Sequence, residues 1–383
     1  MNSNQLSVVS NQFSVSSLQS LISNIPDCPA IISDRFKTLR YDAETNEVVI
    51  LDRRKYPFQT IYERYSTVEG VAVAIEEMVV QGGPPLAYAA ALAMVLAGRS
   101  EEGEAKGEEQ LRAAAARLIA TRPTADDLHH IIPKALEIGL AVEPEARCQA
   151  LLDYANSEIR RGNEVSQKCG WYAAQLLKDG DRILTHCIAG AALCWMLWAA
   201  KCEGKQVRVY SSETRPYFQG ARLTAQSCVE MGIDCTLITD GMSAHLMSQG
   251  MVDKFICAAD RLTLDGHITN KVGTLQHAIA ANYFGLPFYV LGYDGPDPNT
   301  ATAAAIVIEE RDPARLFEAR GKEGTVRTAV PGINGYYPAF DITPPHLIEA
   351  VVTDKGIFPP TLLSRYFTRT VTGSLVVSAP PSS

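Results

Sequence analysis

The chain has 383 residues, which exceeds one average domain, so two domains are expected. With 46% hydrophobic and 20% charged residues, its composition is that of a globular protein that can bury a sizeable core. The net charge of −8 argues against nucleic acid as the main partner, and no continuous apolar run of about 18 residues predicts a membrane span.

The N-terminal segment reads as an extension rather than as part of a domain. Its first 27 residues have neither a basic region nor a continuous apolar run, so they do not form a secretory signal. Because the segment is rich in Ser, Asn and Gln, we expect residues 1–35 to be disordered. At the other end, residues 373–383 are expected to form a flexible tail.

Cysteine and histidine spacing gives no indication of a metal site. The nine cysteines form no C-x-x-C pair and no pattern typical of zinc ligands. An odd number of thiols in a chain of this length favours reduced, mostly buried cysteines and a cytoplasmic location. A G-x-G-x-x-G fingerprint is also absent, so we expect neither a metal nor a dinucleotide cofactor.

The first half of the chain is mainly helical after a short β segment. Apolar runs around the polar turn D-A-E-T-N-E predict a β-hairpin within residues 36–60. Helical spacing of apolar residues over 68–80 is stopped by the Q-G-G-P-P stretch at 81–85, and an alanine-rich helix follows over 86–97. We expect residues 36–165 to form a smaller N-terminal domain of helices with a short antiparallel β element.

The second half has a different pattern. Short apolar runs separated by helix-length intervals predict βαβ units and a parallel, Rossmann-like sheet over residues 166–372. The runs are continuous rather than alternating, as expected for strands buried on both faces. The predicted fold class is therefore α/β. The predicted strands are residues 183–186, 207–210, 235–239, 255–258, 287–291 and 305–308.

Polar side chains directly follow several of these strands. They include the thiol of Cys187, the hydroxyls of Ser211 and Ser212, and the carboxylates of Asp240 and Asp260. In an open α/β sheet, ligands bind outside the carboxyl ends of the strands. The sequence therefore predicts a functional site at this edge.

Cys187 and Asp260 each have a structural and a functional interpretation. Cys187 is either a buried structural thiol or a reactive group at a turn that faces a cleft. Asp260 is either paired with the adjacent Arg261 or catalytic, with a raised pKa. Spacing alone leaves both questions open.

Three further positions are candidates for binding a polar ligand. Asn270 and Lys271 precede the V-G-T of a helix start, where the lysine and backbone N–H groups could bind an anion jointly. Arg122 could do the same, although solvation or a surface salt bridge is the alternative for either cation. Gln219 could recognise sugar hydroxyls, because an amide both donates and accepts hydrogen bonds.

An ordered series of motifs resembles the methylthioribose-1-phosphate isomerase family. The motifs are V-V-Q-G-G-P-P, T-R-P-T-A, I-L-T-H-C-x-A-G-A, S-E-T-R-P-x-x-Q-G-A-R-L-T-A, L-I-T-D-G-M, A-A-D-R-L-T-x-D-G-x-I-T-N-K-V-G-T and P-A-F-D-I-T-P-P-H-L-I. They run from about Arg40 to Gly356, and their order is far more specific than any one of them. The family is related to the regulatory subunits of the exchange factor for translation initiation factor two.

The resemblance implies an aldose–ketose isomerase of methionine salvage that converts 5-methylthioribose 1-phosphate to the ribulose 1-phosphate without a cofactor. It further implies a homodimer, with a small N-terminal domain packed on a Rossmann-like one. The family's catalytic thiol and aspartate fall on Cys187 and Asp260. Its substrate contacts fall on Gln81, Gly82, Gly83, Arg122, Gln219, Asn270 and Lys271. Which member of the catalytic pair is acid and which is base stays open.

The sequence departs from the family pattern around this pair. The usual Arg-Gly-Ala-Pro begins here with Gln81, which cannot replace the charge or the bidentate fork of an arginine. The asparagine after the family's T-H-C has become Ile188, and the loop after the P-F-Y-V strand is also altered. These changes leave open a sugar without the C1 phosphate, such as free methylthioribose, whereas Arg122 and Lys271 favour a phosphorylated sugar.

A non-catalytic alternative is a regulatory or binding protein of the exchange-factor-subunit type. Such a protein need not keep a catalytic pair. The joint presence of Cys187, Asp260, Gln219, Asn270 and Lys271 favours the enzyme.

Overall fold

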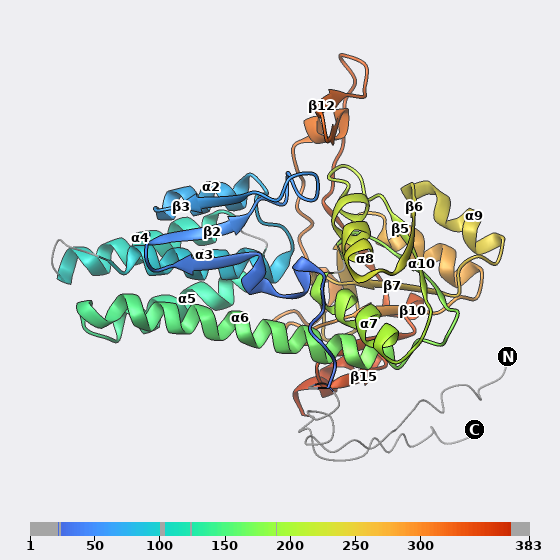
Figure 1. The fold of residues 1–383 in the computed structure, drawn as a ribbon, viewed down its shortest axis with the longest axis horizontal. Coiled ribbons are helices and arrows are strands. Elements are labelled where there is room, and N and C mark those ends of the chain that lie inside the picture. The colour runs from blue at the N-terminus through green and yellow to red at the C-terminus, as the bar shows by residue number, and fades with distance from the viewer. Residues whose placement is uncertain (1–21, 23, 100–103, 123–124, 189, 369–383) are drawn as a thin grey trace.

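The computed structural model describes residues 22, 24–99, 104–122, 125–188 and 190–368 (Figure 1). The expected tail, residues 373–383, and most of the expected N-terminal extension lie outside these ranges. No helix among the described residues is long and apolar enough to cross a membrane.

The N-terminal domain combines a three-stranded antiparallel sheet with a group of helices. The strands are β1 (Leu39–Asp42), β2 (Glu47–Leu51) and β3 (Tyr62–Tyr65), so the predicted hairpin is confirmed and a third strand is added. The helices are α2 (Val68–Glu76), α3 (Gly83–Ala97), α4 (Glu104–Ala120), α5 (Asp126–Leu140) and α6 (Pro144–Ala174).

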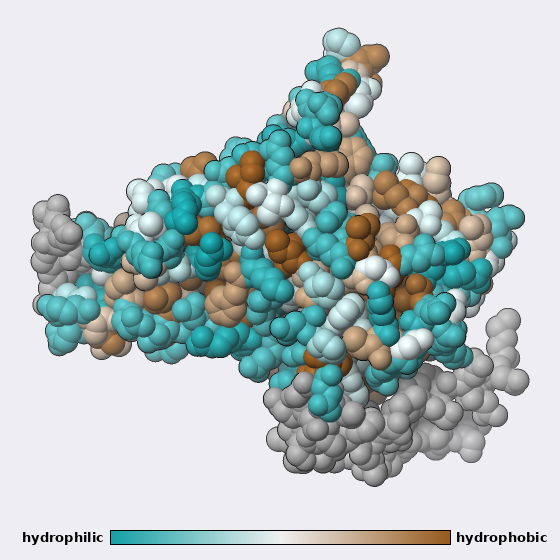
Figure 2. Space-filling view, in the orientation of Figure 1, coloured by the Kyte–Doolittle hydropathy of each residue, from teal (hydrophilic) through white to brown (hydrophobic). Residues whose placement is uncertain are grey.

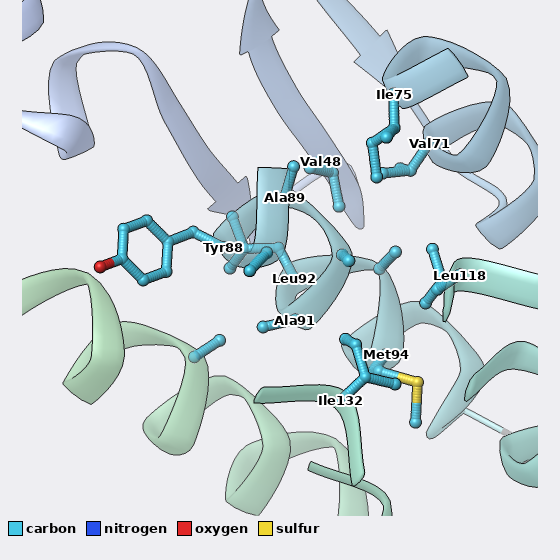
Figure 3. Packing of buried hydrophobic residues seen from close by; sticks show 14 of the residues in the cluster. Val48, Val71, Ile75, Tyr88, Ala89, Ala91, Leu92, Met94, Leu118 and Ile132 are labelled. Atoms are coloured by element: carbon cyan, nitrogen blue, oxygen red, sulfur yellow. The ribbon is translucent and has the colours of Figure 1, made fainter. Parts of the chain in front are cut away.

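Helix α3 is the centre of this domain. From Ala87 to Val95 every residue is buried, as expected for a helix that is apolar on all sides. Figure 3 shows Val71 of α2, Leu118 of α4 and Ile132 of α5 converging on it. Because α3 begins at Gly83, this packing fixes the position of the Q-G-G segment that precedes it.

The large sheet of the C-terminal domain has the order β15-β14-β10-β7-β4-β5-β6 and is parallel except between β14 and β15. Apolar clusters cover both faces, one with α6, α7 and α8 and the other with α9 and α10. The strands are β4 (Arg182–Thr185), β5 (Arg208–Ser212), β6 (Asp234–Ile238), β7 (Lys254–Ala258), β10 (Phe288–Leu291), β14 (Ala350–Thr353) and β15 (Gly356–Phe358). The helices are α7 (Gly190–Cys202), α8 (Ala225–Met231), α9 (Ser243–Ser248) and α10 (Thr274–Tyr283).

Five of the six predicted strands are confirmed, and the one at 305–308 is wrong. That segment leaves a short 3₁₀ turn at Ala303–Ala305 and enters an arm that carries the hairpin β11 (Glu318–Gly321) and β12 (Gly324–Arg327). The arm projects from the body of the molecule in Figure 1. Apolar side chains appear at its tip in Figure 2, in a segment where Val326 and Val330 are exposed. The neighbour of β10 in the sheet is instead β14.

A smaller antiparallel sheet stands beside the large one. Its order is β13-β9-β8, with β8 at Arg261–Leu262, β9 at Ile268–Lys271 and β13 at Phe340–Thr343. In its register Lys271 lies opposite Phe340 and Asn270 opposite Asp341.

The expectation of disorder through residue 35 is wrong for residues 24–35. Cys28, Ala30 and Ile32 are buried in the cluster that contains α7 and α8. Trp198 Nε1 donates a hydrogen bond of 2.8 Å to the carbonyl of Pro26, which ties the segment to α7. These apolar residues follow the Ser- and Asn-rich stretch and bury enough surface to be ordered.

Helix α6 belongs to both domains. Its 31 residues include the expected boundary at 165/166, and Figure 1 shows it running from the N-terminal helices to the large sheet. Near its end, Gly170 lies so close to α7 that an added Cβ would be 2.5 Å from Trp195 Cβ and 2.7 Å from the Ala192 carbonyl oxygen. This contact sets how the two domains meet.

Replacing Gly170 with alanine therefore tests whether the interdomain packing depends on this close approach. We expect the free energy of unfolding to fall by about 1–3 kcal/mol, because the methyl group forces α6 and α7 apart. Gly321→Ala in the arm is the control, since nothing lies within 4 Å of a Cβ there. Equal stability of the two variants in denaturant unfolding would contradict this account.

Candidate active site

A cavity of about 370 Å³ lies where the N-terminal helices meet the carboxyl ends of the large sheet. The chain passes from β4 outward to β5 and β6, and then returns to place β7 on the other side of β4. This reversal is a topological switch point, the place where open α/β sheets bind ligands. All nine residues predicted for the site line this one cavity: Gln81, Gly82, Gly83, Arg122, Cys187, Gln219, Asp260, Asn270 and Lys271.

Cys187 occupies the turn between β4 and α7. Its φ of +64° is in the left-handed region, which a non-glycine residue adopts only when its surroundings hold it there. They do so here: its N–H donates to Thr214 Oγ1 at 2.9 Å, and its carbonyl accepts from Thr224 Oγ1 at 2.7 Å. The turn therefore directs the Sγ atom at the Oε1 atom of Gln219, 3.4 Å away.

The thiol of Cys187 is protonated at neutral pH. Burial raises its pKa to about 12, although the positive charge of Lys271 acts in the opposite direction. The charge of Asp260 contributes to the rise, so the two predicted catalytic groups are close enough to interact. The buried position of this side chain therefore favours the neutral thiol over the thiolate.

Asp260 follows β7, the strand next to β4, and its N–H donates to the Thr269 carbonyl at 2.8 Å. The residue is exposed at the cavity, yet the protein atoms around its carboxyl partly desolvate it. This desolvation raises the pKa of the carboxyl, while the charges of Lys271 and Arg311 lower it. The expected alternative, a pair with Arg261, is not formed, because Arg261 makes its ion pair with Asp126.

Lys271, which was predicted to bind an anion, is a buried cation that lines the cavity. Its Nζ donates to the Ala339 carbonyl at 3.0 Å and lies 4.5 Å from the centre of the Phe340 ring. Burial, followed by the charge of Arg311, lowers its pKa to about 8. Asn270 also lines the cavity, but its Nδ2 donates to Thr274 Oγ1 at 3.0 Å, so it secures the start of α10.

Gln81 and Gln219 form a chain of amides that ends at the thiol. Gln81 Nε2 donates to the Met78 carbonyl at 3.0 Å, and Gln81 Oε1 accepts from Gln219 Nε2 at 3.1 Å. These bonds orient Gln219 so that its oxygen faces the Sγ atom of Cys187. Gln81 thus sets the orientation of Gln219.

Arg122 is held by protein groups at the edge of the cavity. Its Nη1 lies 3.2 Å from Glu309 Oε1, and Glu309 also forms a two-point ion pair with Arg311 at 2.9 and 3.0 Å. Arg122 is therefore partly neutralised, whereas the sequence offered only solvation or a surface salt bridge as alternatives to anion binding.

Several cavity residues were not anticipated from sequence, namely Arg35, Arg53, Asp127, Glu309 and Arg311. Arg53 is the second residue after the apolar strand β2, and this position near a strand end could have marked it as a candidate. Glu309 and Arg311 come from the arm, directly after the segment 305–308 that was predicted to be a strand.

Residues 79–360 match the model of the Initiation factor 2 subunit family. The chain belongs to this family. A relative named methylthioribose-1-phosphate isomerase from Pelotomaculum thermopropionicum is 38% identical over 324 residues, which are 81% of this chain and 88% of the relative. The resemblance drawn from the motifs is thereby confirmed.

Two solved structures have the same α/β fold. The crystal structure of 5-methylthioribose 1-phosphate isomerase from Pyrococcus horikoshii has a TM-score of 0.75 at 30% identity and covers 86% of this chain and 94% of that one. The crystal structure of translation initiation factor eIF-2B, subunit delta, from A. fulgidus has a TM-score of 0.72 at 35% identity and covers 84% and 96%. The solved structures similar to this chain thus include one named as an isomerase and one named as an initiation factor subunit.

Next to Cys187 lies a group of two buried histidines, His186 and His277, and the half-buried Asp240, whose ligand atoms all fall within 4.8 Å of one another. Sequence spacing gave no hint of this group. Its polar atoms have protein partners: His186 Nε2 contacts the Val272 carbonyl at 3.0 Å, and His277 Nδ1 contacts a serine hydroxyl at 2.8 Å. Asp240 accepts two backbone N–H bonds from the loop after β5, each 2.8 Å long. The group therefore acts as a hydrogen-bonded support for the Cys187 turn.

Both histidines are neutral in the folded protein. Burial lowers the pKa of His186 to about 4 and that of His277 to about 3. In the unfolded chain each takes up a proton near its ordinary pKa of about 6.5, so the unfolded state binds more protons between these values. Stability consequently falls as the pH drops from about 6.5 to about 4.

We expect His277→Gln to lose less stability over that interval than the unsubstituted protein, by on the order of 3 kcal/mol. Denaturant unfolding at pH 7, 5.5 and 4.5 measures the difference. His245→Gln, at an exposed position in α9, is the control and should keep the original slope. Parallel slopes for all three proteins would show that the buried histidines do not govern acid stability.

Proposed function

We propose that this protein is an aldose–ketose isomerase that converts 5-methylthioribose 1-phosphate to 5-methylthioribulose 1-phosphate in methionine salvage. The observation that carries the proposal is the single cavity that contains both a thiol and a carboxyl at the switch point of the sheet. The name of the relative that is 38% identical over 88% of its own length supports the same reaction. A homodimer and a cytoplasmic location belong to the proposal as well, and the exposed apolar residues of the arm support association with a second copy.

The reaction has two halves with two proton transfers in each, and it needs no redox partner. In the first half, the Cys187 thiol donates its proton to the ring oxygen as the C1–O4 bond breaks, and the Asp260 carboxylate removes the proton from C2. The product is an enol phosphate with a double bond between C1 and C2. In the second half, the Cys187 thiolate takes the proton of the C2 hydroxyl and Asp260 returns its proton to C1, which restores both groups.

The two pKa shifts support this division of roles. A thiol with a pKa of about 12 begins as a proton donor, and a carboxyl whose pKa is raised by desolvation becomes a stronger base while still able to ionise. Lys271, whose charge acts on both groups, stabilises the thiolate that forms midway. Gln219, held by Gln81, faces the thiol and is placed to hydrogen-bond the sugar.

The other predicted contacts have supporting roles. Arg122 and Lys271 contribute positive charge for the phosphate, and Gly82 and Gly83 let the backbone approach the ligand closely. Asn270 acts through the start of α10, because its amide is already bonded to Thr274. The proposed chemistry uses only these side chains and needs no metal or other cofactor.

Unphosphorylated methylthioribose is the alternative substrate, favoured by the glutamine at position 81. A regulatory role is the alternative from another class, since a solved relative at 35% identity is named as an initiation factor subunit. Both alternatives predict a different outcome in the assay below.

Purified protein is expected to form the ketose from methylthioribose 1-phosphate, and more slowly or not at all from the unphosphorylated sugar. Cys187→Ser and Asp260→Asn should each lower kcat by roughly 10²- to 10⁴-fold, because each removes one proton-transfer group. Cys194→Ser is the control, a buried thiol on α7 that does not line the cavity. Turnover of the unphosphorylated sugar alone would identify the other substrate, and turnover of neither would exclude the proposed reaction.

The pH dependence should reflect Lys271. Below a pH of about 8 the ammonium is charged and binds the anionic substrate; above it the charge is lost, so kcat/KM should fall up to tenfold per pH unit. Lys271→Arg keeps the charge at high pH and should move this fall upward by more than one unit. An unchanged position of the alkaline limb would show that another group controls it.

A further inference from the structure

Arg53 is a buried cation at the cavity. It is the second residue after β2, is 3% exposed and lines the cavity. Its Nη1 donates to the backbone carbonyl of Gln81, and its Nη2 lies 3.4 Å from Thr38 Oγ1. Within the part of the chain that the structure describes, no carboxylate forms an ion pair with it.

A second buried arginine increases this imbalance. Arg35 is 4% exposed and also lines the cavity; it donates to Asn163 Oδ1 at 3.1 Å and to Ser166 Oγ at 2.7 Å, and its Nε has no partner. Burial and the positive charge of Arg35 together lower the pKa of Arg53 to about 10. Two neighbouring guanidinium groups withdrawn from water are unfavourable unless an anion joins them.

The N-terminus of α3 provides donors at the same place. Gly82 has a φ of +93°, and an added Cβ there would be 3.9 Å from Arg53 Nη1, so the helix start and the guanidinium are adjacent. The first residues of α3 have no preceding turn to accept their N–H bonds, and Pro84 and Pro85 have no N–H at all. The N–H group of Gly83 therefore has no acceptor within the helix, and it lies beside the cavity at the end that carries the positive dipole.

The carboxyl of Asp127 lies beside this helix start, yet it forms no ion pair with Arg53 among the described residues. Its Oδ2 would be 3.1 Å from a Cβ on Gly83. Burial and the charges of Asp294 and Asp126 raise its pKa to about 7, and the charge that lowers it is that of Arg161. Among the described residues, no carboxylate thus neutralises the buried guanidinium of Arg53.

We infer that Arg53, together with Arg35 and the N-terminus of α3, binds the phosphate of the substrate and supplies the positive charge that Gln81 lacks. The inference rests on the proposed function, in which the substrate is a sugar phosphate. It explains how a chain with glutamine in place of the family arginine can still bind an anion. The guanidinium comes from β2 and reaches the segment where the family motif carries its own arginine.

The arrangement also explains what Gln81 does in place of the arginine. Its amide joins Met78 to Gln219 and so orients the group that faces Cys187. An arginine at 81 beside Arg53 and Arg35 would add a third buried charge. Arg53, after β2, therefore supplies the positive charge, and the neutral amide of Gln81, before α3, orients Gln219.

The test compares Arg53→Gln with Arg147→Gln. Arg147 is equally buried, donates to the Gly139 carbonyl at 2.8 Å, and does not line the cavity, so it controls for the loss of a buried guanidinium. Arg53→Gln should raise KM for methylthioribose 1-phosphate roughly 10- to 100-fold with a smaller change in kcat. Inorganic phosphate should stabilise the unsubstituted protein and Arg147→Gln against heat, and Arg53→Gln much less.

Two further variants complete the test. Arg53→Lys keeps the charge without the bidentate guanidinium. Its KM and its stabilisation by phosphate should lie between those of the unsubstituted protein and Arg53→Gln. This variant preserves the comparison if Arg53→Gln does not fold. Arg53→Gln combined with Gln81→Arg moves the charge to the family position and should recover part of the lost phosphate binding. Equal stabilisation of Arg53→Gln and the unsubstituted protein by phosphate, or an unchanged KM, would overturn the inference.

The phosphate measurement is independent of turnover. Arg53-dependent phosphate binding without isomerase activity would reject the proposed reaction and keep the anion site. Activity with an Arg53-independent KM would keep the reaction and reject the site.

Discussion

Desolvation of the ionisable side chains around the cavity between the two domains is the constraint on which the chemistry of this protein depends. The cavity lies where the N-terminal helices meet the carboxyl ends of β4 and β7, so protein atoms surround these side chains and partly replace water. Desolvation acts on them in a common direction, toward the uncharged form. It raises the pKa of Cys187 and Asp260 and lowers that of Lys271, so the thiol stays protonated, the carboxylate becomes more basic and the ammonium becomes easier to deprotonate.

The rest of the fold maintains this enclosure. Helix α6 spans both domains, and the glycine contact with α7 allows them to meet closely. The buried helix α3 fixes the Q-G-G segment above the sheet, while the paired histidines support the turn that carries Cys187 from below. Groups that never touch a ligand thus determine where the reacting atoms lie.

The site residues that could be predicted from the sequence are those that directly follow strands of the parallel sheet. Cys187 and Asp260 could be assigned to neighbouring positions because parallel strands place their carboxyl ends at one edge. Arg53, Arg35 and Arg311 could not, because they enter the cavity from β2, from the N-terminal segment and from the arm, whose positions depend on tertiary packing. The same limit explains the wrong strand at 305–308: its apolar run is local, whereas the place beside β10 is taken by β14, some forty residues later.

The number of positive charges that such a cavity can hold is limited more strictly than the elements that carry them. A phosphate needs cationic or N–H donors within hydrogen-bond reach, but a guanidinium on a long side chain can arrive there from different elements. Each added buried cation also raises the cost of the empty site, so a second arginine at position 81 would work against Arg53 and Arg35. Replacing the family arginine by glutamine therefore does not by itself indicate that phosphate binding is lost. The balance of buried charges around the whole cavity is the better guide to the substrate, and here it favours an anion.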